Sequence, residues 1–101
     1  MTAELTRLIV QATRELGTEQ GLDIAADIGP DTRLFGEGGL LDSMALVSLV
    51  IAVEQAIEEQ HGVTVGLADE KALSQRSSPY RTVGSLAAYA AQELEARRKH
   101  G

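Results

Sequence analysis

Hydrophobic residues recur at three- and four-residue steps in three stretches of the chain, a spacing typical of amphipathic helices. The first stretch runs from about Thr2 to Gly17, where the glycine is the expected C-cap. The second is the longest, from Leu41 to about Gln60, and His61-Gly62 ends it. The third follows Thr82, a favoured N-cap residue type. Its inner stripe consists of Val83, Leu86, Ala87, Ala90 and Leu94.

Turn and loop residues occupy the segments between these helices. Residues 18–40 form a long connection, in which Leu34 and Phe35 are expected to anchor the chain in the core. Residues 63–65 alternate as extended chain does, and residues 68–73 favour one short helix. The residues expected to be buried between the second and last helices are Val47, Val50, Leu86 and Leu94. The pattern therefore predicts an all-α fold, a bundle of three longer helices and one short helix.

The second helix opens at Asp42-Ser43, directly after a glycine-rich loop. Both residue types favour the N-cap position, because a short side-chain oxygen can accept from the free N–H groups of the first turn. Ser43 is then either a plain cap, worth about 1 kcal/mol, or an attachment point. A phosphate ester on its hydroxyl would lie against the positive end of the helix dipole. Position alone leaves both interpretations open.

Composition narrows the classes of function. The chain of 101 residues has a net charge of −6, which disfavours nucleic acid as a partner because phosphate neutralisation needs a basic face. It has no cysteine, so it supplies no thiol, disulfide or thiolate metal site. We expect one domain over residues 1–101, with a core of about 3–96 and a basic tail at 97–101.

Catalytic and membrane-spanning patterns are missing from the sequence. His61 and His100 have no nucleophile or carboxylate partner near them in sequence, and there is no metal-ligand spacing or glycine-rich phosphate loop. There is also no charged-then-apolar leader and no apolar run of the length of a membrane span. These features predict a cytoplasmic monomer that is not an enzyme and does not insert stably into membranes.

Two parts of the sequence resemble the acyl carrier proteins. The segment Asp42-Ser43-Met44 and the helix after it are similar to that family's Asp-Ser-Leu signature and second helix. The similar helix positions are Val47, Leu49, Val50, Val53, Glu54 and Ile57. The segment Arg81-Thr82-Val83-Gly84-Ser85-Leu86, with Tyr89, resembles the Thr-Val-x-x-Leu-x-x-Tyr opening of its last helix. The resemblance covers roughly residues 30–94.

The resemblance implies a function and a cofactor. Ser43 would carry a 4'-phosphopantetheine arm, transferred from coenzyme A by a phosphopantetheinyl transferase, and Asp42 would help that enzyme to recognise or orient the site. The thiol of the arm would hold an acyl group as a thioester. The partners would be an acyl-activating ligase, a condensing enzyme or an acyltransferase.

The sequence departs from the common fatty-acid carriers in the first part of the second helix. Ala45, Leu46 and Ser48 stand where those carriers usually have acidic residues, and Met44 replaces the usual Leu. This composition favours a specialised fatty-acid, polyketide or related pathway.

The same departure predicts how partners dock. We expect an apolar contact around Met44 and Leu46, with Glu54 and Asp69 as charged residues at its rim. The alternative for Leu46 is that it turns inward and packs in the core. Val47 and Ile51, with Met44, are candidates for the surface or the layer just below it, beside the arm.

Two other functions remain open. The arm could carry aminoacyl or peptidyl groups in place of acyl groups. Alternatively, the chain is an unmodified helical interaction module, in which Ser43 serves only as an N-cap.

Overall fold

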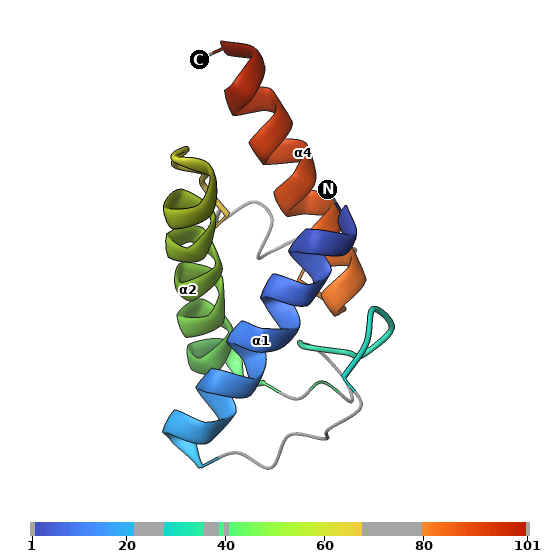
Figure 1. The fold of residues 1–101 in the computed structure, drawn as a ribbon. Helices are drawn as coiled ribbons and strands as arrows, with labels where there is room; N and C mark the ends of the chain where they lie inside the picture. Colours follow the sequence, from blue (N-terminus) through green and yellow to red (C-terminus); the bar gives the residue numbers. More distant parts are fainter. Residues whose placement is uncertain (1, 22–27, 36–38, 40, 68–79, 101) are drawn as a thin grey trace.

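The computed structural model describes residues 2–21, 28–35, 39, 41–67 and 80–100. Three helices make up most of these residues: α1 (Thr2–Gln20), α2 (Ser43–His61) and α4 (Val83–His100). Helix α1 crosses in front of the other two in Figure 1 and packs against both of them. The described residues contain no strand, so the all-helical prediction with three longer helices is confirmed. The short helix expected at residues 68–73 lies outside the described residues.

Helices α1 and α2 each end at a glycine in the left-handed conformation. Helix α1 continues through Gly17, which is buried, and ends at Gln20 because Gly21 adopts the left-handed conformation with φ of +68°. The prediction of a C-cap at Gly17 was therefore wrong. Helix α2 ends as expected, since Gly62 has φ of +66° and donates its N–H to the carbonyl of Glu58 at 2.8 Å.

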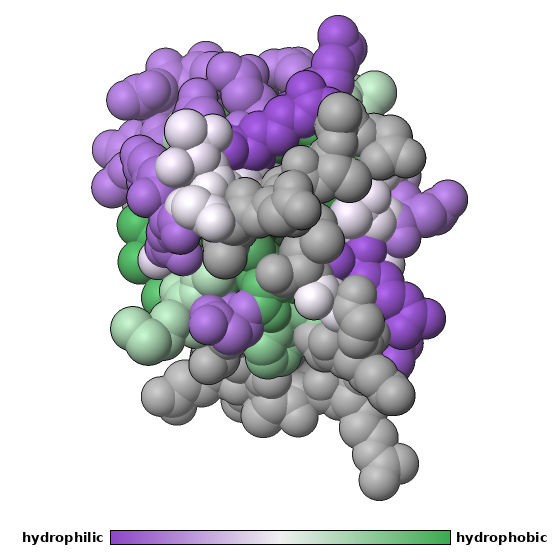
Figure 2. All heavy atoms as spheres, turned by 90° about the horizontal axis from the view of Figure 1, so that it is seen from below, coloured by the Kyte–Doolittle hydropathy of each residue, from purple (hydrophilic) through white to green (hydrophobic). Residues whose placement is uncertain are grey.

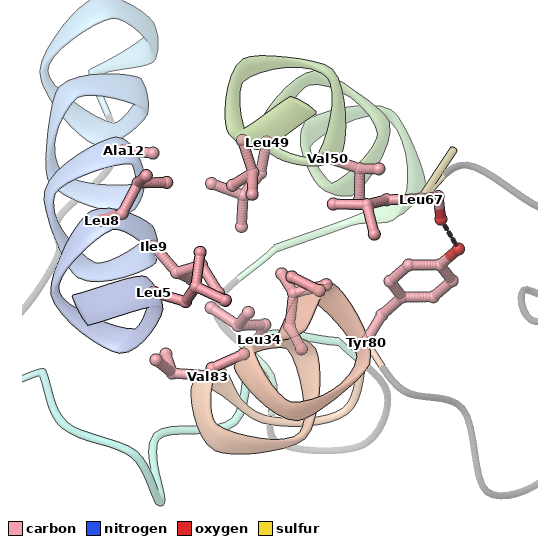
Figure 3. Close-up of a cluster of buried hydrophobic side chains, with 14 of the residues drawn as sticks. Leu5, Leu8, Ile9, Ala12, Leu34, Leu49, Val50, Leu67, Tyr80 and Val83 are labelled. Atoms are coloured by element: carbon pink, nitrogen blue, oxygen red, sulfur yellow. Dashed lines mark hydrogen bonds between the residues drawn. The ribbon is translucent and has the colours of Figure 1, made fainter. Parts of the chain in front are cut away.

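Aliphatic side chains from all three helices meet in one core (Figure 3). Leu5 and Ile9 of α1 and Leu49 of α2 point into the same space as Leu34 of the first connection. Burial of such side chains is the main favourable term in folding, at roughly 25 cal/mol for each Å² of apolar surface removed from water. Beyond the labelled residues, the core also contains Val53, Ile57, Leu86, Ala90 and Leu94.

The expected core positions were mostly correct. Val50, Leu86 and Leu94 are buried, as predicted, whereas Val47 is 41% exposed and that prediction was wrong. Leu34 is buried, and Phe35 is only half-buried at the edge of the core.

Backbone hydrogen bonds join the first connection to the start of α4. Leu34 donates to the carbonyl of Arg81 at 2.8 Å, and Val83 donates to the carbonyl of Thr32 at 3.0 Å. At the same place Thr82 caps α4, because its Oγ1 accepts from the N–H of Ser85 at 3.0 Å. The Ser85 Oγ accepts in return from the N–H of Thr82 at 3.0 Å. The pair forms a reciprocal capping box, which confirms Thr82 as the N-cap.

Candidate functional site

Asp42 is the N-cap of α2. Its backbone is extended, with φ of −81° and ψ of 179°, and its Oδ1 accepts from the N–H of Ala45 at 2.8 Å. Its carbonyl accepts the first helical hydrogen bond, from Leu46 at 2.9 Å. Ser43 is consequently the first residue inside the helix. The interpretation of Ser43 as the cap of this helix is wrong, because the neighbouring aspartate fills that position.

The chain that leads into Asp42 is held in place by backbone contacts. Leu41 is buried and donates its N–H to the carbonyl of Leu34 at 2.8 Å. Gly39 passes so close to Phe35 that a Cβ at this glycine would lie 2.8 Å from the backbone N, Cα and C of Phe35. Only glycine fits such a close approach. The position of the Asp42-Ser43 pair is therefore set by the fold on its N-terminal side.

The electrostatics of this helix start suit a negative group. The first turn of a helix has N–H groups without intrahelical acceptors, and the helix dipole places partial positive charge there. Helix α2 has no acidic residue in its first turn, and no charged side chain occurs between Ser43 and Val53. A phosphate ester at Ser43 would meet the N–H groups of the first turn that Asp42 does not already occupy, and the carboxylate of Asp42 would be a negative neighbour on its N-terminal side. The residues present therefore fit a phosphate-linked group.

An exposed apolar stripe begins beside Ser43. Met44, Val47 and Ile51 are 81%, 41% and 44% exposed, and they share one face of α2 because they are three and four residues apart. We call these three residues the α2 stripe. Figure 2 views the end of the molecule at which α2 begins, and hydrophobic surface is visible there on the side of α2. Met44 and Ile51 are thus exposed as expected, and of the two placements expected for Val47, in the core or near the surface, the second is correct.

Leu46 lies on the opposite side of the helix. Its side chain is only 1% exposed and packs in the core with Leu49 and Val50. These residues are three and four positions apart and so share the buried face. Leu46 therefore offers no surface to a partner, and its expected place in an exposed contact was wrong; the inward alternative is correct.

Glu54 has an internal hydrogen bond. Its Oε2 accepts from the N–H of Leu67 at 2.7 Å, and the side chain is only partly exposed. The carbonyl of Leu67 accepts from the hydroxyl of Tyr80, which is fully buried (Figure 3). Glu54 is therefore engaged in holding the segment after α2, a role that no short-range sequence pattern indicates. Asp69, the other expected rim residue, lies outside the described residues.

The described residues bring no metal-binding group together. No three of their His, Asp or Glu side chains are arranged to hold an ion. His61 at the end of α2 instead approaches Glu4 at the start of α1, with 3.6 Å between Nε2 and Oε1. None of the helices in the described ranges has both the length and the hydrophobicity needed to cross a bilayer.

No family model, curated protein or solved structure matches the chain. A function is therefore inferred from the residues around Ser43 and from their geometry.

Proposed function

We propose that the protein is a carrier of the acyl-carrier-protein type, with a 4'-phosphopantetheine arm on Ser43. The observation that carries this proposal is the capping of α2 by Asp42. Because Asp42 already caps the helix by accepting from the N–H of Ala45, an N-cap role does not explain why a serine stands at position 43. The serine stands at the first helical position, beside an exposed apolar stripe. The proposal includes a fourth, short helix at residues 68–73, a segment outside the described residues.

In this proposal Ser43 is a nucleophile for a separate transferase. Its Oγ attacks the phosphorus of coenzyme A that bears the pantetheine, and a new Oγ–P bond forms. The P–O bond of the pyrophosphate breaks, and adenosine 3',5'-bisphosphate leaves. The serine proton passes to a base of the transferase. Asp42 caps the helix and supplies a carboxylate one residue before Ser43, which the transferase can use to recognise or orient the site.

The helix start then stabilises the product. A phosphodiester on Ser43 is a permanent negative charge next to the positive end of α2, an interaction worth about 0.3–1 kcal/mol at an exposed site. The arm, when attached, supplies the thiol that holds an acyl group as a thioester, which this cysteine-free chain cannot supply itself. Tethering raises the effective concentration of the acyl group at a partner's active site.

The α2 stripe is the proposed docking surface for partner enzymes. It begins with the residue after Ser43, and Val47 lies one turn further along the helix. Its apolar character and the absence of charge up to Val53 favour a partner with an apolar surface. Partners of this kind would be an acyl-activating ligase, a condensing enzyme or an acyltransferase of a specialised fatty-acid, polyketide or related pathway.

The test is the intact mass after incubation with coenzyme A and a phosphopantetheinyl transferase of broad specificity. The wild-type protein should gain one phosphopantetheinyl group and Ser43→Ala should gain none. Ser48→Ala is the matched control, because Ser48 is an exposed serine on the same helix. It should be modified like the wild type. Equal mass gain in Ser43→Ala would refute the assignment of the site.

Two alternatives give different outcomes. An aminoacyl or peptidyl carrier gains the same mass but is then loaded by an amino-acid-activating enzyme in place of a fatty-acid ligase. An unmodified interaction module gains no mass, and the exposed α2 stripe would then be its whole binding surface. The mass measurement separates the module from both carriers.

A further inference from the structure

A histidine and a glutamate meet where the end of α2 lies beside the start of α1. The two helices run in opposite directions (Figure 1), so these two ends come together. The Nε2 atom of His61 lies 3.6 Å from Oε1 of Glu4. The side chain of His61 is 15% exposed and that of Glu4 is 55% exposed, so the contact lies at the edge of the interface between α1 and α2.

The Nε2 atom of His61 is buried and has no hydrogen-bond partner among the described residues. A buried polar atom without a partner is unfavourable for folding. The Glu4 carboxylate is an acceptor close by, but a separation of 3.6 Å is longer than a hydrogen bond. Because Glu4 is more than half exposed, its side chain has room to close this distance by a small change of rotamer. The two side chains are therefore placed for one further hydrogen bond.

The charge of the imidazole decides how strong that hydrogen bond is. Histidine is the side-chain type that changes charge between pH 5 and pH 8. In the protonated form both ring nitrogens are donors, so Nε2 offers an N–H and a positive charge to the Glu4 carboxylate. In the neutral form one ring nitrogen is an acceptor, and no net charge attracts the carboxylate. A stronger contact is therefore expected with protonated His61 than with neutral His61.

The described chain places few charged groups around His61. Helix α1 contributes Glu4 and, one turn later, Arg7, which is exposed. Helix α2 contributes Glu58, which is exposed one turn before His61, and the negative end of its dipole. Residues 62–67 contain no titratable side chain, and the backbone of α4 comes close to α1 and not to α2 within the described residues. Glu4 is the one of these groups that lies within ion-pair distance of His61.

We propose that His61 and Glu4 form a pH-sensitive contact that ties the start of α1 to the end of α2 in mild acid. The N–H groups in the first turn of a helix have no intrahelical acceptors, so this part of α1 is where an added tie opposes fraying. Ser43 lies at the other end of α2, about 27 Å away along the helix axis. The inference goes beyond the proposed function and holds whether or not Ser43 carries an arm.

The test is a double-mutant cycle on the full chain, measured at pH 5.5 and at pH 8.0 in buffer of low ionic strength. The variants are Glu4→Gln, His61→Gln and the two together, because glutamine is polar and does not titrate. Urea denaturation followed by circular dichroism gives the unfolding equilibrium constant of each protein. The matched control is a second cycle in which Glu19→Gln replaces Glu4→Gln, since Glu19 is an exposed glutamate at the other end of α1.

At pH 5.5 the coupling between Glu4 and His61 should change the unfolding equilibrium constant by about two- to fivefold, the range of exposed ion pairs. At pH 8.0 the coupling should vanish, and added salt should reduce it at pH 5.5. The control cycle should show no coupling at either pH. A general loss of stability in His61→Gln does not imitate this result, because the cycle isolates the pairwise effect. Equal coupling at the two pH values, or no coupling at pH 5.5, would overturn the proposal. The gain of phosphopantetheine mass at Ser43 is a separate measurement, so failure here leaves the proposed function intact.

Discussion

The carboxylate of Glu54 accepts a hydrogen bond from the backbone N–H of Leu67 across 2.7 Å. The carbonyl of the same leucine accepts from the hydroxyl of Tyr80. The side chain of Leu67 is fully buried. Leu67 is therefore held on one side by α2 and on the other by the residues that precede α4. This arrangement fixes the chain that leaves α2 over the core.

Removal of the Glu54 carboxylate should destabilise the fold. In Glu54→Ala the Leu67 N–H loses a charged acceptor, and we expect the free energy of unfolding to fall by about 1–3 kcal/mol. Glu54→Gln retains an acceptor oxygen and should lose less. Urea denaturation monitored by circular dichroism measures both. Glu58→Ala is the control, because Glu58 is exposed on the same helix, and it should change stability by less than about 0.5 kcal/mol. Equal losses in Glu54→Ala and Glu58→Ala would contradict a structural role for this hydrogen bond.

Substitutions at Asp42 and at Ser43 should differ in their effect on stability. Asp42→Ala removes the N-cap and should lower the free energy of unfolding by about 1 kcal/mol. Ser43→Ala leaves the cap in place, and alanine is a strong helix former, so its stability should match the wild type. The same two variants are tested for the gain of phosphopantetheine mass. A Ser43→Ala protein that loses as much stability as Asp42→Ala would show that the serine hydroxyl has a structural role.

The sequence predicted helix ends well where the signal is local. Thr82 with Ser85 and Gly62 after α2 are short-range cap motifs, and both are present in the structure. The end of α1 was predicted wrongly, because the first glycine, Gly17, was taken as the C-cap, whereas the helix ends before Gly21, four residues later. The left-handed conformation of Gly21, which the sequence does not reveal, is what ends the helix there.

The sequence predicted the buried face of α2 poorly, and the reason is physical. Nearly all side chains from Met44 to Val53 are apolar, so the hydrophobic pattern does not define which face meets the core. Val47 was expected in the core but is exposed, and Leu46 was expected at the surface but is buried. Both errors follow from this ambiguity. Contacts with α1 set the rotation of the helix, and they are long-range. The bond from Glu54 to Leu67 was missed for a similar reason, since it joins residues that are far beyond one helical turn.

Gly39 should be required for the position of the site. A methyl group at Gly39 meets three backbone atoms of Phe35 at 2.8 Å, so the loop must shift in Gly39→Ala. We expect a loss of about 1–3 kcal/mol in unfolding free energy, as for other overpacked sites. We also expect slower phosphopantetheine transfer to Ser43. Gly66→Ala is the matched control, because nothing lies within 4 Å of a Cβ at Gly66 and its φ is not positive. Its stability should stay equal to the wild type or rise slightly. Identical melting and transfer rates in the two variants would exclude this role for Gly39.

The stability of Leu46 and Met44 variants should reflect the two faces of α2. Leu46 is buried, so Leu46→Ala should cost about 2–5 kcal/mol through lost contacts and a cavity. Met44 is 81% exposed, and Met44→Ala should change stability by less than about 0.5 kcal/mol. Thermal melting followed by circular dichroism compares the two. Similar melting temperatures in both variants would mean that the buried face of α2 is assigned incorrectly.

The same Met44→Ala variant tests the docking surface, because it removes an exposed side chain and leaves the fold intact. The measurement is the KM of an acyl-activating ligase for the phosphopantetheine-bearing carrier, with kcat determined in parallel. If the α2 stripe carries the contact, KM should rise several-fold while kcat stays unchanged, since truncating a central apolar anchor costs more than about 1 kcal/mol. Added salt should alter KM little, because no charged side chain lies between Ser43 and Val53 to be screened. Glu58→Ala, an exposed change nearer the end of α2, is the control and should keep the wild-type KM. An unchanged KM in Met44→Ala, together with a steep salt dependence in the wild type, would place the contact on charged residues and reject the apolar stripe.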